Sequence, residues 1–234
     1  MGKSTLLRFV HGKRMNGVQI VSRFLEFSQL RQEFPEFRRK FNQPYLEVLY
    51  TLLHFMRTTS DSGVGGPDLC VTDRMPLANL IYDFLFRYNG QHSPRRLITL
   101  FRAYATEREN MTQEDVDRVA AFDFAFRTFA AEVRKQKNYH VIFTIASNVS
   151  RTADCLAARD KPKEVNVRAY VASQNVLFRR AAENMGSDVC SLIYVSDFVT
   201  LQQMFLVVSK VFPRLTAEPF VDLSKSMMQQ TTKG

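Results

Sequence analysis

The sequence predicts an α/β protein in which a parallel β-sheet is flanked by helices. Three observations predict this fold: short uncharged β-branched segments, longer segments with helical periodicity, and the alternation of the two along the chain. Of the 234 residues, 45% are apolar and 24% charged, a balance typical of globular domains rather than disordered or collagen-like chains. No composition break suggests a linker, and we therefore expect a single domain over residues 1–234.

The first part of the chain is expected to contain two helices and two strands. Apolar residues at helical spacing predict a helix over Ser4–Val10, and a β-branched run after an Asn-Gly pair predicts a strand over Gly17–Val21. The wide apolar face of Tyr45–Met56 predicts the second helix, and the Ser, Gly and Thr residues of Thr58–Pro67 predict a loop. A second buried strand is expected over Leu69–Thr72.

Helices are expected to predominate in the middle of the chain. We predict one helix over Pro76–Tyr88 and another that begins at Ser93 and Pro94, which have the order of a helix cap and a first-turn proline. A long helix is expected from Thr112 to Lys137, with its cap near Thr112.

The aromatic residues of this long helix are expected in the core. Phe122, Phe126 and Phe129 recur at helical spacing among alanines, which is more typical of a buried face than of an exposed stacking platform.

Two later strands complete the expected sheet. Val141–Ala146 is uncharged throughout, like parallel strands that are buried on both faces, and Ser191–Val195 is similar.

The charge pattern favours an anionic ligand. Lys and Arg number 32 against 23 acidic residues, a formal charge of +9 that would attract nucleic acid, nucleotides or anionic lipid.

No charge-free stretch reaches the roughly 20 residues of a membrane-spanning helix. Lys3 and Arg8 interrupt any signal peptide, and Leu6 stands where N-myristoylation requires Ser or Thr. From these three observations we expect no membrane partner. Three widely spaced cysteines form neither a disulfide framework nor a metal site, so we expect an intracellular protein.

The first candidate site is Gly2-Lys3-Ser4-Thr5, at the start of the first predicted helix. It matches the second half of the phosphate-binding loop G-x-x-x-x-G-K-[ST], in which backbone N–H groups surround phosphates, Lys neutralises them and the hydroxyl binds Mg²⁺. The first strand of the fold and the first half of the loop would precede Met1, and we expect both to be missing from this chain. A bare G-K-S-T also occurs frequently by chance.

The second candidate site is Asp73-Arg74, between a buried strand and the following helix. Ligands bind at the carboxyl ends of parallel strands, where an Asp beside an Arg could hold hydrated Mg²⁺ and a hydroxyl-bearing or anionic substrate together. The same residues also fit a helix N-cap Asp followed by a solvated Arg.

The third candidate site is a group of cations after the expected strand Val141–Ala146. Arg159 and Lys161 lie in a charged segment, with Arg151 before it and Arg168 after it. Such cations could fold over a triphosphate and stabilise the charge of a migrating phosphoryl group. A run of charges is usually a solvated surface.

In this order the three sites resemble the herpesvirus-type thymidine kinases, which are deoxynucleoside kinases of the P-loop class. The resemblance is densest in one block, which is similar to D-R-H-P-[IL]-A … A-R-Y-x-x-G-x-x-[ST]-P of the family: Asp73-Arg74-x-Pro76-Leu77-Ala78, Arg87-Tyr88, Gly90 and Ser93-Pro94. Three other segments are more weakly similar to family motifs. Met1 to Thr5 is similar to the family's G-M-G-K-T-T, and Phe24-Leu25-Glu26-Phe27 stands where the family has P-E-P-M. Arg159-x-Lys161-Pro162-x-Glu164, with Gln174-Asn175-Val176 after it, is similar to the R-x-R-P-G-E lid and the helix behind it.

The resemblance implies ATP-dependent phosphorylation of the 5′-hydroxyl of thymidine or a related deoxynucleoside. Lys3 and the N–H groups of Gly2, Ser4 and Thr5 would hold the phosphates of ATP, and Ser4 and Asp73 would hold Mg²⁺. We therefore expect ATP and Mg²⁺ as the cofactors.

The same resemblance implies the residues that would bind and activate the nucleoside. Glu26 would be the general base, Arg74 would hold the 5′ end of the nucleoside, and Arg87 would flank its base. Gln43 is the candidate for reading the base, although it also fits an ordinary residue at a helix entry. Arg159 and Lys161, with Arg151 as a weaker candidate, would close over the γ-phosphate.

The chain departs from the family pattern at several positions. Met75 replaces the usual His, Lys161 replaces a lid Arg, Cys155 stands where another lid Arg is expected, and no proline flanks Glu26. From the residues alone, Glu26 equally fits an exposed acid near Arg23.

Two other functions are compatible with the sequence. One is a kinase of a nucleoside monophosphate such as thymidylate, and the other is a non-catalytic basic protein that binds nucleic acid. The Phe residues follow apolar helical faces instead of alternating with exposed cations, so we expect no stable nucleic-acid partner. The kinase interpretation allows a homodimer.

Overall fold

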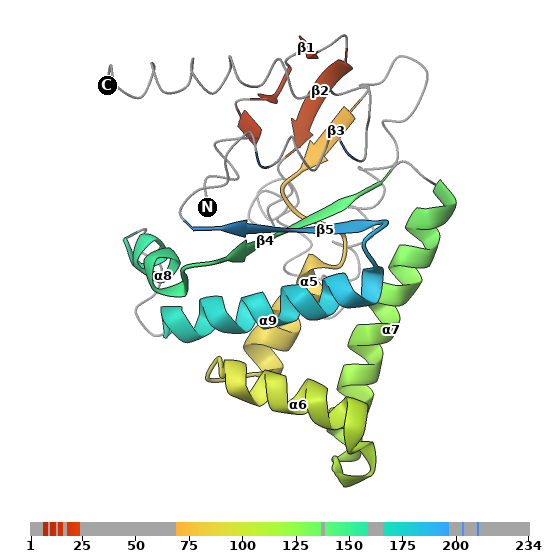
Figure 1. Ribbon diagram of the computed structural model, residues 1–234, viewed down its shortest axis with the longest axis vertical. Coiled ribbons are helices and arrows are strands. Elements are labelled where there is room, and N and C mark those ends of the chain that lie inside the picture. Colours follow the sequence, from red (N-terminus) through yellow and green to blue (C-terminus); the bar gives the residue numbers. More distant parts are fainter. Residues whose placement is uncertain are drawn as a thin grey trace, which may run out of the picture. The chain divides into compact units, whose positions relative to one another are not determined.

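The structure of the protein is a computed structural model that describes residues 7, 8, 10–12, 14–15, 18–23, 69–136, 139–158, 166–196, 203 and 210. The chain divides into two compact units, one of residues 77–197 together with Met1 and the other of residues 2–76 and 198–234. The single domain expected over residues 1–234 concerns both units together and stays a prediction. The described residues form a mixture of helices and strands, with two small sheets that each contain a parallel pair of strands (Figure 1).

The sheet of the unit that contains residues 2–76 has the order β1-β2-β3. Its strands are β1 (Arg14–Met15), β2 (Val18–Arg23) and β3 (Leu69–Thr72). β1 and β2 are antiparallel, whereas β2 and β3 are parallel, from the pair Ile20 and Leu69 to the pair Arg23 and Thr72. The predicted strand over residues 69–72 is confirmed. β2 extends to Arg23, beyond the predicted Val21, because its pairing with β3 continues.

A helical turn precedes this sheet. Leu7 and Val10 are buried, and the backbone N–H of His11 donates to the Leu7 carbonyl at 3.1 Å. Gly12 then adopts a φ of 74°, which favours glycine, and its N–H donates to the Ile20 carbonyl of β2 at 2.9 Å. The described part of the predicted helix over residues 4–10 is therefore helical.

The sheet of the other unit pairs β4 (Val141–Ala146) with β5 (Cys190–Val195) in parallel. Parallel neighbours require a crossover connection, and here it consists of α8 (Val149–Ala157) and α9 (Val167–Met185). The side chains of β4 alternate between buried and half-buried positions. Both predicted strands are confirmed, and β5 begins one residue earlier than expected.

Before β4, the chain forms α5 (Ala78–Asp83), the π-helical turn η2 (Phe84–Tyr88), α6 (Pro94–Thr106), the short 3-10 turn η3 (Arg108–Asn110) and α7 (Gln113–Gln136). Both predicted caps are present. The Ser93 hydroxyl accepts from the Arg96 N–H, and the Thr112 hydroxyl accepts from the Asp115 N–H, each at 3.2 Å.

One predicted helix has a different geometry from the expected one. Residues 84–88 form a wider turn, and the Asn89 N–H donates to the Phe84 carbonyl five residues earlier, at 3.0 Å. Within this turn Phe84 is buried, whereas Phe86 is 49% exposed. Apolar spacing alone predicts a helix here and does not distinguish its π-helical part.

The core of this unit is aromatic. Phe122 and Phe126 of α7 are fully buried, and the ring of Phe122 lies 5.2 Å from that of Phe84. Both residues were expected in the core. Phe129 is only half-buried, and its ring lies edge-on to Tyr139 at 5.7 Å, so it lines the border of the core.

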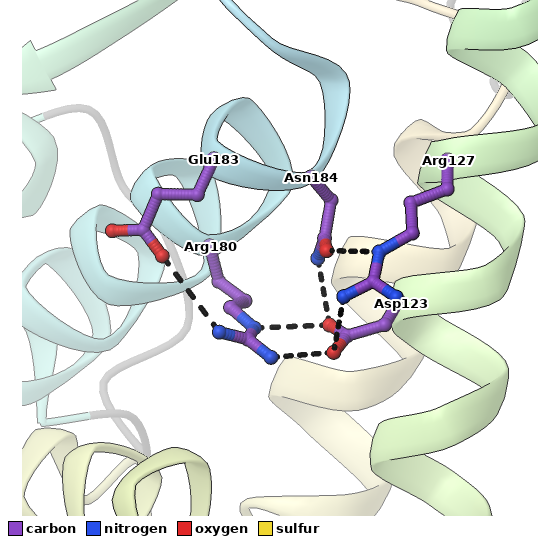
Figure 2. Close-up of polar contacts among 5 residues, drawn as sticks. All are labelled: Asp123, Arg127, Arg180, Glu183 and Asn184. Carbon is purple, nitrogen blue, oxygen red and sulfur yellow. Dashed lines mark hydrogen bonds and ion pairs between the residues drawn. The ribbon is translucent and has the colours of Figure 1, made fainter. Parts of the chain in front are cut away.

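A buried carboxylate joins α7 to α9 within this apolar core. Asp123 is 3% exposed, and Figure 2 shows its two oxygens facing Arg180 and Asn184 of α9. The Arg180 guanidinium donates to both oxygens, with Nε at 2.9 Å from Oδ1, and Asn184 Nδ2 donates to Oδ1 at 2.6 Å. Arg127 of α7 adds an ion pair at 3.7 Å. We call these four residues the Asp123 cluster.

A second carboxylate joins the same two helices at the surface. Arg134 of α7 donates to both oxygens of Asp188, with distances of 2.5 and 2.9 Å, just after α9 ends. Both side chains are about half-exposed. These hydrogen bonds lower the pKa of Asp188 to about 2. Gly186 makes the turn between α9 and Asp188 with a φ of 84°.

The three cysteines, Cys70, Cys155 and Cys190, are free, as expected for a chain without a disulfide framework. Burial raises the pKa of the Cys190 thiol to about 12. Within the described parts of the chain, no helix has the length and apolar character needed to cross a bilayer.

Candidate functional site

Asp73 and Arg74 directly follow β3, at its carboxyl end. The Thr72 hydroxyl donates to the Arg74 backbone carbonyl at 2.9 Å, which fixes the turn that leaves the strand. Asp73 is 7% exposed and Arg74 is half-buried. The helix α5 begins only after Leu77, so Asp73 lies too far ahead of it to act as its N-cap. The fold therefore gives Asp73 a place at the end of a parallel strand.

The parallel neighbour of β3 ends at the same edge of the sheet. Arg23, the last residue of β2, pairs in register with Thr72, the last residue of β3. The carboxyl ends of β2 and β3 are therefore level, and Asp73 directly follows the end of β3. Glu26 comes three residues after Arg23 in the sequence. Glu26 and Gln43 lie outside the described residues, as do Gly2, Lys3, Ser4 and Thr5 of the predicted phosphate loop.

The other unit has a second strand end of the same type. At the carboxyl end of β4, the buried side chain of Asn175 forms two hydrogen bonds with Ala146: it accepts from the backbone N–H at 3.0 Å and donates to the carbonyl at 2.9 Å. Asn148 then caps α8 by accepting from the Arg151 N–H at 3.0 Å. Figure 1 shows α8 and the start of α9 at this end of the β4-β5 pair.

The predicted cations are distributed around this connection. Arg159 and Lys161 fall between α8 and α9, in residues 159–165, which lie outside the described parts of the chain. Arg151 lies in the first turn of α8 with an exposed side chain. Arg168, in the first turn of α9, forms a long ion pair of 3.9 Å with Asp154 of α8, and both side chains are mostly exposed.

Arg87 lies in the other unit from Arg74, so the structure describes each of the two separately. Its guanidinium forms an ion pair of 2.7 Å with Asp83, one helical turn earlier, and about half of the side chain is exposed. The fragment that carries the family resemblance is therefore divided between two units.

Sequence reasoning missed an aromatic cluster beside Arg87. The ring of Phe86 lies 5.3 Å from His92, 5.7 Å from Tyr170 of α9 and 6.3 Å from Tyr82. Gln174 of α9 donates to the Tyr82 hydroxyl at 3.3 Å. Tyr82 and Phe86 are one helical turn apart, and this spacing could have indicated that their rings are neighbours. The contact with Tyr170 could not be predicted in this way, because it depends on the packing of α9 on η2.

Tyr88 is a second residue that the sequence did not single out as a contact point. Its hydroxyl donates to the Asp115 carboxylate of α7, while the guanidinium groups of Arg96 and Arg118 lie 5.1 and 5.0 Å from its ring centre. Burial, together with the bond to Asp115, raises the pKa of Tyr88 to about 12. Tyr88 thus joins η2 to the first turns of α6 and α7.

The described histidines have structural or exposed positions, as expected. His11 is exposed, and the Nδ1 of buried His92 lies 3.2 Å from the Leu85 carbonyl. His140 Nε2 lies 2.9 Å from the Ser191 hydroxyl, and burial lowers the pKa of His140. His54 lies outside the described residues.

The part of the chain that the structure describes contains no group of three or more His, Cys, Asp or Glu side chains that could hold a metal ion. This finding is compatible with one class of metal site. Mg²⁺ keeps several waters and is bound in phosphoryl-transfer enzymes through one or two carboxylates plus the phosphates of the substrate. The carboxylate of Asp73, at the end of a strand, is of the kind that such a site uses.

Comparison of the chain with protein-family models, with curated proteins and with solved structures gives no match. The geometry of the described residues therefore carries the functional argument. That geometry consists of two parallel strand pairs with polar residues at their carboxyl ends: Asp73 and Arg74 follow β3, and Asn175 of α9 bonds to the last residue of β4.

Proposed function

We propose that the chain is a deoxynucleoside kinase of the P-loop class, which transfers the γ-phosphoryl group of ATP to the 5′-hydroxyl of thymidine or a related deoxynucleoside. One observation carries the proposal: Asp73 and Arg74 directly follow β3, whose end is level with that of its parallel neighbour β2. In parallel sheets this edge is the usual place for ligands.

In the proposed reaction, each of these residues either accepts a proton or balances a charge. Glu26 takes the proton of the 5′-hydroxyl, the oxygen attacks the γ-phosphorus, and ADP leaves. Asp73 and Ser4 would hold Mg²⁺, and Lys3 would neutralise the donor phosphates. When bound, Mg²⁺ would offset charge on the phosphates.

The connection between α8 and α9 supports a lid role for Arg159 and Lys161. Asn175 ties α9 to the last residue of β4, and Asn148 caps α8 two residues after that strand, so residues 159–165 connect two anchored helices. Cations at this point would act on the charge that develops during transfer.

The test is transfer of radiolabelled phosphate from ATP to thymidine, with thymidylate as the parallel acceptor. Transfer to thymidine supports the proposal. Transfer to thymidylate alone would favour the monophosphate kinase, and binding of nucleic acid without transfer to either acceptor would favour the non-catalytic alternative.

Variants assign the roles within the active protein. Glu26→Gln should retain thymidine affinity within a few-fold and lower kcat by roughly 10²-fold or more, because it removes the base and retains the shape.

Arg159→Ala and Lys161→Ala should lower kcat more than they raise the KM for thymidine. Arg179→Ala, an exposed Arg of α9, is the matched control and should leave kcat unchanged.

A further inference from the structure

The helix α6 carries an unbalanced charge. Its 13 residues include three arginines and no acidic residue. Two of these arginines, Arg95 and Arg96, lie in the first turn, and no basic residue lies in the last turn. The N-terminus of a helix has a partial positive charge, so arginines in the first turn are unfavourable for the helix itself. Contacts outside the helix are needed to offset this cost.

Among the described residues, only one of the three arginines has such a contact. The guanidinium of Arg96 lies 5.1 Å from the ring centre of Tyr88. Arg95 and Arg102 are exposed, and in the part of the chain that the structure describes neither side chain has an ion pair, a hydrogen bond or a ring contact. By contrast, Arg118 of α7 forms an ion pair of 2.7 Å with an acid one helical turn away. The charges of Arg95 and Arg102 are thus available to another molecule.

These two arginines belong to one exposed stripe of α6. We call it the α6 stripe, and its members are Arg95, Ile98, Arg102 and Ala105. They are alternately three and four residues apart and lie within about 80° of one another around the helix, which is the arrangement of the a and d positions of a coiled coil. Ile98, between the two arginines, is 47% exposed although it is a large apolar residue. The stripe therefore offers an apolar contact between two cations that are about 10 Å apart along the helix.

The α6 stripe lies on an outer surface of its unit. Leu97, Leu100 and Phe101, on the opposite side of α6, are buried. α6 packs on α9, which in turn packs on β4 and β5, and Figure 1 shows α9 between α6 and this strand pair. The stripe therefore faces away from the core of the unit.

We propose that the α6 stripe is a docking surface for an acidic helix of a partner protein, in which carboxylates and apolar residues alternate along one side. Charge complementarity selects this partner. Two acids seven residues apart on a helix are separated by about 10 Å, which matches the separation of Arg95 and Arg102, and an apolar residue between them would cover Ile98. In the antiparallel direction, the partially negative C-terminal end of the partner helix would also lie beside the arginines in the first turn of α6.

Other occupants fit the stripe less well. A second copy of this chain does not offer such a helix, because none of the described helices carries two acids seven residues apart. A single-stranded nucleic acid would stack on exposed aromatic rings beside the cations, whereas the centre of the stripe is aliphatic. A membrane surface would require a wide apolar face, whereas the other large apolar side chains on α6, Leu97, Leu100 and Phe101, are buried.

Fluorescence anisotropy of a labelled synthetic helix tests the docking surface on the full chain. The probe, called the Glu peptide, is a hydrocarbon-stapled helix of about two heptads with Leu at the a positions and Glu at the d positions, which is complementary to the stripe in the antiparallel direction. It should bind with a dissociation constant on the order of 100 µM at low salt, because two exposed ion pairs and one apolar contact form a small interface. The same peptide with Gln in place of Glu should bind about tenfold more weakly.

Charge reversal on both molecules locates the contact. Arg95→Glu/Arg102→Glu should lower the affinity for the Glu peptide by roughly 30-fold or more, and it should bind a peptide with Lys in place of Glu about as tightly as the parent binds the Glu peptide. Lys135→Glu/Arg179→Glu is the matched control, because it makes the same change in net charge at exposed positions of α7 and α9. This control should bind the Glu peptide within a few-fold of the parent.

Ile98 distinguishes a protein partner from a bare polyanion. Ile98→Asp should lower the affinity for the Glu peptide about tenfold or more, because it removes the apolar contact and adds a like charge. An oligodeoxycytidylate and phosphatidylserine vesicles are the competing probes. Both should bind the parent more weakly than the Glu peptide does, and Arg95→Gln/Arg102→Gln should bind the Glu and Gln peptides equally.

Three results would overturn the proposal. The first is a Gln peptide that binds the parent as tightly as the Glu peptide. The second is a charge-reversed variant that has the helix content of the parent and does not bind the Lys peptide. The third is tighter binding of the oligonucleotide or the vesicles through Arg95 and Arg102, which would identify the stripe as a general site for polyanions.

Discussion

Two carboxylates are buried among the described residues, and they stand at contrasting places in the chain. Asp123 lies in the middle of a long helix, where Arg180, Asn184 and Arg127 surround it. Asp73 lies at the end of a parallel strand, level with the end of its neighbour. Burial alone therefore does not identify a functional acid. The element that carries the residue decides whether its charge serves the packing of helices or lies at an edge where ligands can bind.

The largest effect is expected at Asp123. Asp123→Asn removes the buried counter-charge of the mostly buried Arg180 and leaves it only a 3.8 Å ion pair with the exposed Glu183, so the free energy of unfolding in urea should fall by about 3–5 kcal/mol. Glu132→Gln, an exposed acid of the same helix, is the control and should change stability by less than about 0.5 kcal/mol.

A double variant sharpens this prediction. Asp123→Leu/Arg180→Met removes both charges and fills the space with apolar groups, and it should be more stable than Asp123→Asn. A double variant that is less stable than the single one would show that the geometry of the whole Asp123 cluster, rather than charge balance, holds α7 on α9.

The next effect concerns function. If the proposed function is right, Asp73→Asn should lower phosphoryl transfer to thymidine on the order of 10²-fold, and part of the loss should return when Mg²⁺ is raised, because the amide would weaken the proposed Mg²⁺ site. Transfer assays at two Mg²⁺ concentrations measure this. If Mg²⁺ recovers nothing and stability falls as far as in Asp123→Asn, the contrast between the two aspartates is wrong.

A smaller effect is expected at the surface contact between the same helices. In Gly186→Ala, the new methyl group would lie 2.8 Å from both Arg134 Nη2 and Asp188 Oδ1, at a backbone φ of 84°. The free energy of unfolding should fall by about 1–3 kcal/mol. Gly90→Ala separates the two causes, because Gly90 has a φ of 58° and open space around it, so only the backbone cost applies and the loss should be smaller.

The smallest effect is the pH dependence of the Asp188 contact. Arg134 lowers the pKa of Asp188 from 3.8 to about 2, so the contribution is complete above about pH 4 and is lost as the pH falls towards 2. The melting temperatures of the parent and Asp188→Asn should differ slightly at neutral pH and converge near pH 2. Since the pair is exposed, the difference should be far smaller than that of Asp123→Asn.

The sequence predicted those elements whose pattern is local. Ser93 and Thr112 gave correct helix starts because a cap depends on hydrogen bonds three residues away. Val141–Ala146 was correct in both bounds because a buried parallel strand is a continuous apolar run. The π-helical turn of Phe84–Tyr88 was missed because its apolar spacing is also that of an ordinary helix.

Features that depend on distant residues could not be predicted in this way. Asp123 is one of several acids on α7, and only the packing of α9 brings Arg180 to it, 57 residues later. Asn175 was noticed through a resemblance, whereas its two bonds to Ala146 require the fold. Of the candidate site, the strand-end position of Asp73 and Arg74 was predictable, and the expected partners Glu26, Arg159 and Lys161 stay predictions.

Tyr88 makes this molecule suitable for an optical measurement. Tyrosinate absorbs at longer wavelengths than tyrosine, and an ordinary tyrosine ionises near pH 10, whereas Tyr88 has a pKa of about 12. In an alkaline titration its absorbance change should therefore occur at a higher pH than that of an ordinary tyrosine. Asp115→Asn should move that step to lower pH, so a spectrophotometer alone would report whether η2 is docked on α7.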